Sequence, residues 1–210
     1  MTMPETPLPP LFQQLPRQQA KDYLEQFVAE LPASRERLEG MLGAAGADPA
    51  LAHDLSPESL DALWATAQGW QVGWQRDYIP PPNTASPPIS APTLEALGPL
   101  DELPSWFVHD RVHSLRYSPQ TLWVVDVLGR HLGEVVLAQH PHLRWTLGPA
   151  KPAGNIDRGY PVTGTATAWV NPLRVAAGLI GRRLSDQDVP GAPSTLRDVY
   201  DRQTATAATW

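Results

Sequence analysis

The amino-acid sequence predicts an α+β fold with a helical N-terminal layer, a proline-rich connector and a small antiparallel sheet packed by two C-terminal helices. Three observations indicate this class. Apolar residues recur at three- and four-residue steps over 17–79 and again over 118–140, which is typical of amphipathic helices. Residues 143–147 alternate between apolar and polar side chains, as a half-buried strand does. The chain has 24 prolines among 210 residues, more than twice the average usage, and many of them lie between these segments.

The N-terminal part is predicted to be a lead-in followed by three helices. Residues 1–16 are rich in proline, which denies the backbone regular hydrogen bonding, so we expect a disordered lead-in. Within the helical layer over 17–79, the first helix begins near Arg17 and the second is closed by Gly46. Ser56 and Pro57 give the start signal of the third helix.

Residues 80–104 form the proline-rich connector. Proline prevents a helix here, except for a turn around 93–97, and favours a semi-rigid extended chain. An alternative is a proline-rich ligand for an aromatic-lined groove. We favour the linker, because the segment contains no basic residue.

The unit over 105–202 is predicted to contain the sheet. Residues 106–117 are compatible with short strands. Ser118 suits the N-cap and Pro119 the first position of a long helix, which Pro141 ends. The strand over 143–147 follows at once.

The remaining elements follow a long loop. Residues 148–164 are rich in glycine and proline, and a loop of that length is either functional or disordered. Alternation predicts a second strand over 165–170, and a helix starts at Asn171 and Pro172. Ser194 caps a last short helix that ends near Arg202, before a tail over 203–210. We expect residues 17–202 to form one compact domain.

Composition excludes several classes of protein. Without cysteine there is no disulfide framework, thiolate nucleophile or cysteine-based metal site. The N-terminus lacks a signal-peptide pattern and no apolar run approaches the ~20 residues of a membrane helix, so we expect a cytoplasmic bacterial protein with no membrane partner. The net charge of −6 disfavours nucleic acid as a partner, although Arg174, Arg182 and Arg183 could form a local basic edge.

Catalytic motifs are missing from the sequence. It contains neither of the glycine-rich phosphate-binding patterns and no Gly-x-Ser-x-Gly elbow. The best enzymatic alternative is a metal-dependent hydrolase, since a histidine pair beside a carboxylate and a histidine–glutamate pair could together hold a divalent ion. Its candidate ligands are His109, Asp110, His113, His131 and Glu134. We favour ordinary surface or hydrogen-bonded roles for them, because the His-Glu-x-x-His pattern is absent, and we expect no cofactor.

The long helix over 118–140 carries two further features. Asp126 and Glu134 are eight residues apart and could be imagined as a paired carboxylate site, but exposed helix carboxylates are much commoner than catalytic ones. Gly129 and Gly133 lie four apart and lower helix propensity. We interpret them as a packing notch that lets another backbone come close.

Tryptophan is abundant, with eight residues in the chain. Trp64, Trp123 and Trp145 lie on or beside predicted apolar faces, so we expect them in the core. Four others are candidates for an exposed patch that binds a partner, which monomers rarely leave uncovered. They are Trp70, Trp74, Trp106 and Trp169.

One segment resembles a known family. Gly133 and Glu134 on the predicted helix, followed by Arg144 and Trp145 on the strand, resemble a motif of uncharacterised bacterial proteins, in which an aromatic-x-Gly-Glu helix precedes an Arg-Trp strand. His131 stands where the motif has its aromatic residue. The resemblance implies a fold and no established activity. It marks Glu134 as a residue that either pairs with Arg144 or serves a site.

These observations favour a non-enzymatic interaction or adaptor protein. Its partner is expected to be another protein or a second copy of the chain. The metal-dependent hydrolase is the first alternative, and a nucleic-acid-associated protein is the second.

Overall fold

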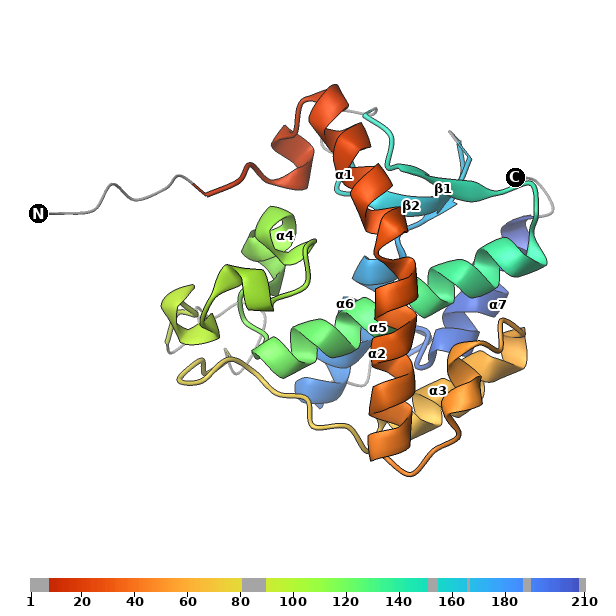
Figure 1. Cartoon of the computed structure of the whole chain (residues 1–210), viewed down its shortest axis with the longest axis horizontal. Coiled ribbons are helices and arrows are strands. Elements are labelled where there is room, and N and C mark those ends of the chain that lie inside the picture. The colour runs from red at the N-terminus through yellow and green to blue at the C-terminus, as the bar shows by residue number, and fades with distance from the viewer. Residues whose placement is uncertain (1–7, 81–89, 151–154, 166, 187–189, 208–210) are drawn as a thin grey trace, which may run out of the picture.

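The computed structural model describes residues 8–80, 90–150, 155–165, 167–186 and 190–207. Over these residues it confirms the α+β class, with several helices and one small antiparallel sheet that lies beside α1 (Figure 1). The α helices are α1 (Arg17–Ala29), α2 (Leu31–Ala44), α3 (Pro57–Ala67), α4 (Phe107–Ser114), α5 (Pro119–Gln139), α6 (Pro172–Leu184) and α7 (Leu196–Ala207). The short 3-10 helices are η1 (Phe12–Gln14), η2 (Pro49–Ala52), η3 (Glu95–Leu97) and η4 (Leu100–Glu102). The strands are β1 (Arg144–Leu147), β2 (Pro161–Gly164) and β3 (Trp169–Val170).

Helix α5 crosses the middle of the molecule (Figure 1). It begins as predicted, because the Ser118 hydroxyl accepts a hydrogen bond from the Thr121 amide at 3.2 Å and Pro119 occupies the first helical position. Fourteen of its 21 residues are buried. The buried surface of α5 is therefore wider than the three- and four-residue periodicity predicts, and it includes Val124, Val127 and Val135.

Two glycines let other elements approach α5 closely, as predicted. A Cβ atom on Gly129 would lie 3.0 Å from the Cα of Leu173, so α6 packs backbone to backbone there. A Cβ atom on Gly133 would lie 2.3 Å from the Trp145 ring of β1. The notch at Gly133 thus accepts an indole ring rather than a backbone.

The sheet has the order β1-β2-β3, with both pairs antiparallel. Strand β1 confirms the prediction over 143–147. The strand predicted over 165–170 is reduced to β3, and the central strand β2 lies in the segment predicted as a loop. Val162 and Thr163 of β2 are fully buried, and Thr163 is opposite both Trp145 and Val170 in register.

Three other segment predictions need correction. Phe12 and Leu15 of the predicted lead-in are buried, while residues 1–7 lie outside the described residues. The connector contributes Leu97 and Leu103 to the core, with 81–89 outside the described part. Helix α7 continues through the predicted tail as far as Ala207, and 208–210 are not described.

Helix α4 (Phe107–Ser114) occupies most of the segment 106–117, for which short strands were predicted, and Tyr117 forms an isolated β-bridge with Trp74. Phe107, Asp110 and Ser114 share the buried face of α4, at spacings of three and four residues. Two of these three side chains are polar, so the face does not stand out as an apolar stripe in the sequence.

The guanidinium of Arg130 on α5 contacts the junction of α1 and α2. These two helices follow each other nearly in line (Figure 1). Arg130 Nε donates to Asp126 Oδ1 at 2.7 Å and its Nη2 to Glu30 Oε2 at 2.7 Å. Its Nη1 donates to the Phe27 carbonyl at 2.5 Å, and the group stacks 3.8 Å above the Phe27 ring. Only 3% of the Arg130 side chain is exposed.

Hydroxyl groups complete this buried cluster. Ser34 donates to Asp126 Oδ2 at 2.9 Å, and Ser105 donates to Glu30 Oε2 at 2.6 Å. Tyr23 hydrogen-bonds Ser105 at 3.1 Å. Helices α1, α2 and α5 and the end of the connector therefore meet at one set of polar contacts.

Buried apolar side chains from Phe12 to Tyr200 form a single cluster around α5. None of the helices in the described ranges is both long and apolar enough to cross a membrane.

Replacement of Gly133 by alanine is expected to destabilise the protein by roughly 1–3 kcal/mol, because the new methyl group overlaps the Trp145 ring. Urea unfolding followed by circular dichroism measures the effect. Gly40→Ala on α2 is the matched control, since a Cβ atom there meets nothing within 4 Å. That variant should gain up to about 1 kcal/mol from helix propensity. Equal stability changes at the two glycines would contradict the proposed contact.

Candidate functional site

The predicted metal ligands are divided between two helices. His109, Asp110 and His113 lie on α4, and His131 and Glu134 lie on α5. Within the described residues, no three His, Asp or Glu side chains are grouped so that they could hold a metal ion.

His131 is a buried, neutral hydrogen-bonding residue. Ser59 donates its proton to the Ser56 carbonyl at 2.7 Å, so its hydroxyl oxygen accepts from His131 Nε2 at 3.1 Å. Burial lowers the pKa of His131 to about 4. The negative charge of Asp54 opposes this fall, and the positive charge of Arg35 adds to it. The ring therefore joins α5 to the start of α3 in its uncharged form.

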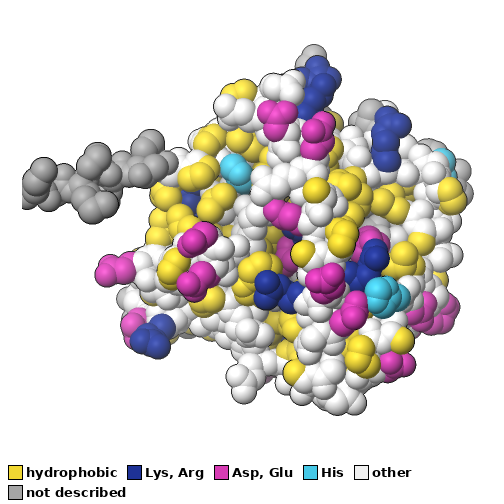
Figure 2. Space-filling view, in the orientation of Figure 1, with side chains coloured by type: hydrophobic (Ala, Val, Ile, Leu, Met, Phe, Trp, Pro, Cys, Tyr) yellow, Lys and Arg dark blue, Asp and Glu magenta, His cyan; other side chains and the backbone are white. Residues whose placement is uncertain are grey.

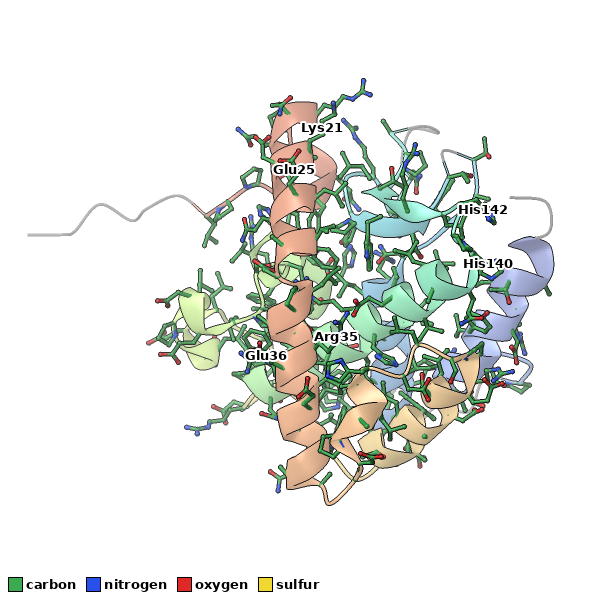
Figure 3. The ribbon with its side chains drawn as sticks, turned by 45° about the vertical axis from the view of Figure 1, so that its right-hand side comes forward. Lys21, Glu25, Arg35, Glu36, His140 and His142 are labelled. Atoms are coloured by element: carbon green, nitrogen blue, oxygen red, sulfur yellow. The ribbon has the colours of Figure 1, made fainter. Side chains whose placement is uncertain are left out.

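Glu134 pairs with Arg35 of α2 and not with Arg144, whose pairing with Glu134 was one of the two roles left open by the resemblance. Figure 3 shows Arg35 in the first half of α2, on the side toward α5. Burial raises the pKa of Glu134, and the Arg35 guanidinium opposes that rise. Asp126 is engaged by Arg130 instead, so the two carboxylates of α5 do not form a paired site.

The α4 residues of the predicted set have other roles. His109 Nδ1 hydrogen-bonds the Pro10 carbonyl at 2.7 Å, and its ring packs against Phe12 and Tyr23. Burial lowers the pKa of His109. These contacts hold the N-terminal segment, residues 8–16, on α4.

Asp110 is the carboxylate of α4 and is buried, with 6% of its surface exposed. Tyr160 donates to one carboxylate oxygen, and Ser114 donates to the other at 2.5 Å. Burial raises the pKa of Asp110, although both hydroxyl donors and the charges of His113 and Arg174 oppose the rise. The carboxyl group links α4 to the residue that precedes β2.

Two hollows flank Val112 on the outer side of α4. The larger has a volume of about 410 Å3, and its walls include Tyr78, Pro92, Arg116 and Arg174. The smaller has a volume of about 40 Å3 and lies against Leu11, Gln13 and His109 of the N-terminal side. Asp110, Val112 and His113 border both hollows. Val112 thus forms a ridge between them, and 66% of its surface is exposed.

The N-terminal segment extends this surface. Arg111 Nη1 donates to the Pro9 carbonyl at 2.6 Å, and Gln13 donates to the Ile156 carbonyl at 3.1 Å. Ile156 has 54% and Leu8 43% of its surface exposed. We define the α4 face as Leu8, Val112, Ile156 and the two hollows beside Val112. In Figure 1, α4 and the N-terminal segment lie at the left of the molecule.

The four tryptophans proposed as an interaction patch separate into two groups. Trp70 and Trp106 are buried, with 8% and 1% exposed, so neither belongs to an exposed patch. Trp74 and Trp169 are half-buried. Trp74 stacks at 5.5 Å on Tyr117, which lines the larger hollow, and Trp169 donates at 3.1 Å to Asp157, the residue after Ile156.

The predicted basic edge on α6 is occupied by internal contacts. Arg183 donates to the carbonyls of Ala67 and Gln68, and Arg182 donates to the carbonyl of Pro193. Arg174 lies 3.5 Å from Asp157. Figure 2 shows Lys and Arg interspersed with Asp and Glu on the face in view.

The sequence prediction missed Val112 as a surface feature. Short strands, with which residues 106–117 are compatible, leave the direction of its side chain undetermined. The spacing of Phe107, Asp110 and Ser114 fits one face of a helix, and Val112 lies on the opposite, exposed side.

The stability of the protein is expected to fall as the pH falls from 6.5 towards 4, because His131 must remain neutral in the fold while it is protonated in the unfolded chain. The stability that neutral His131 contributes is fully present above pH 6.5. The difference between its pKa of 6.5 in the unfolded chain and about 4 in the fold corresponds to roughly 3 kcal/mol. Urea unfolding at several pH values measures it. His131→Gln, which cannot titrate, should lack this part of the pH dependence. An identical pH profile in both proteins would refute a neutral, buried His131.

Comparisons with protein-family models, curated proteins and solved structures found no match to this chain. The resemblance to an uncharacterised bacterial family therefore stays a prediction. Packing explains two of its motif positions, since Gly133 receives the Trp145 ring. Glu134 serves an ion pair with Arg35, and Arg144 is exposed.

Proposed function

We propose that this chain is a non-enzymatic protein-binding module and that its α4 face contacts the partner. The observation that carries the proposal is the exposed ridge of Val112 between two hollows, with Ile156 and Leu8 exposed nearby. Apolar side chains that stand beside hollows are typical of the central part of a protein interface. Within the described residues, these three are among only five large apolar side chains that are exposed.

The charges around the larger hollow favour a partner with carboxylates. The cations Arg116 and Arg174 line it beside His113, and Arg174 also lies 3.5 Å from Asp157. The one acidic residue that lines the hollow, Asp110, is buried and accepts hydrogen bonds from Tyr160 and Ser114. The matching surface is therefore an apolar side chain flanked by Asp or Glu, which lets apolar burial supply affinity and charge supply orientation.

The face is held in place before any partner arrives. His109, Arg111 and Gln13 form hydrogen bonds between the N-terminal segment, α4 and the loop that contains Ile156. A preorganised surface loses less conformational entropy on binding. The internal pairing of Asp126, His131 and Glu134 also supports binding over catalysis, since none of these groups is left available as a base or nucleophile.

Selection of a library of displayed random peptides on the purified protein tests the proposal. Enriched peptides should combine an apolar residue with Asp or Glu, and Val112→Glu or Ile156→Glu should weaken their binding by about tenfold or more, because each places a charge in the apolar part of the face. Fluorescence anisotropy measures the affinities.

The control is Val28→Glu on α1, which changes a side chain that is 38% exposed outside the α4 face. It should leave the affinity unchanged. Peptides that bind Val112→Glu as tightly as the parent protein, or that lose binding only in Val28→Glu, would place the interface elsewhere.

A further inference from the structure

A third hollow lies on the other side of the N-terminal segment, between α1 and the end of β1. Its volume is about 590 Å3, within the range of roughly 300–1,000 Å3 that is usual for small-molecule sites. The walls are largely apolar and come from η1, α1, β1 and the residues after β1. The apolar side chains that line it are Phe12, Leu15, Ala20, Leu24, Leu147, Pro149 and Ala150.

The charged residues of this hollow all have the same sign. Arg17, Lys21 and Arg158 line it, and no acidic side chain does so among the described residues. In Figure 3, Lys21 lies toward the N-terminal end of α1, one turn before Glu25. A cationic rim around an apolar floor is unusual in a chain whose net charge is −6.

These three cations also differ from most others in the protein. Ten of the described Lys and Arg side chains have a partner inside the molecule, either a carboxylate, a carbonyl, a hydroxyl or an aromatic ring. The described cations without one are Arg17, Lys21, Arg76, Arg144 and Arg158. Three of these five line the same hollow.

We propose that this hollow binds a single amphiphilic anion, a carboxylate that carries an unbranched aliphatic chain. The chain would replace water against Leu15, Leu24 and Leu147, and the carboxylate would lie among Arg17, Lys21 and Arg158. Burial of the chain supplies the affinity, while the cations select the sign of the head group. This site is independent of the proposed protein partner at the α4 face.

Isothermal titration calorimetry with octanoate, decanoate and dodecanoate, each below its micelle concentration, tests the site. We expect one ligand per protein and an affinity that rises about three- to fourfold with each added methylene. Decyltrimethylammonium has a chain as long as that of decanoate and the opposite charge, so it should not bind measurably. Equal binding of the two head groups, or no dependence on chain length, would overturn the proposal.

Variants locate the site. The double variant Lys21→Glu/Arg158→Glu should weaken decanoate binding about tenfold or more, since it turns attraction into repulsion. Leu24→Gln should reduce the dependence on chain length. Arg144→Glu is the matched control, because Arg144 is also unpartnered but does not line the hollow, and it should bind as the parent protein does.

Vesicles distinguish a free ligand from a membrane surface. Co-sedimentation with phosphatidylglycerol vesicles should be no stronger for the parent protein than for Lys21→Glu/Arg158→Glu. Binding to those vesicles without binding to monomeric decanoate would contradict a single-ligand site. Thermal melting of every variant establishes that a loss of binding is not a loss of folding.

Discussion

Arg130 is a cation held almost entirely out of water at the centre of the molecule, and such a group is tolerable only when its partners are fixed in place. Asp126, Glu30 and the Phe27 carbonyl are those partners, and they come from two places in the chain, α5 and the end of α1. The requirement to satisfy one guanidinium therefore sets where the junction of α1 and α2 lies on α5. A purely apolar contact would permit many small displacements, whereas directional hydrogen bonds to a buried charge permit few.

The same cluster reaches the two proposed binding regions through ordered side chains. Ser105 connects Glu30 to Tyr23, and the Tyr23 ring packs against His109 at 4.9 Å and Phe12 at 5.2 Å. His109 belongs to the helix of the α4 face, and Phe12 lines the hollow between α1 and β1. The N-terminal segment thus lies between the α4 face and the hollow between α1 and β1. Contacts through Tyr23, Ser105 and Glu30 connect it to Arg130.

Local signals in the sequence were enough to predict α5 and β1. Ser118, Pro119 and Pro141 set the ends of α5 through their immediate neighbours. The two glycines of α5 indicate that another element comes close, without indicating which element it is. Strand β2 could not be predicted in the same way, because its pairing with β1 and β3 is a long-range contact within a glycine- and proline-rich segment. Helix α4 was missed because polar Asp110 and Ser114 occupy its buried face.

The residues of the candidate site were harder to predict from the sequence than the helices and strands, because their contacts depend on tertiary structure. Charge complementarity between Glu134 and Arg144 is equally plausible in sequence, but the structure brings Arg35 of α2 to Glu134. The exposure of Val112 and Ile156 follows from how the N-terminal segment and the loop before β2 pack beside α4. The periodicity of apolar residues along the chain does not predict how the N-terminal segment or the loop before β2 packs beside α4.

The central claim is that buried partners of Arg130 organise the fold, and a double-mutant cycle in urea tests it most directly. Arg130→Met should lower the free energy of unfolding by about 3–5 kcal/mol, because it leaves the carboxylate of Asp126 buried without its cation and removes the partner of Glu30. Asp126→Leu in the same chain should recover part of that loss, so the two effects should be far from additive. A loss below about 1 kcal/mol in Arg130→Met, or strict additivity with Asp126→Leu, would contradict the account.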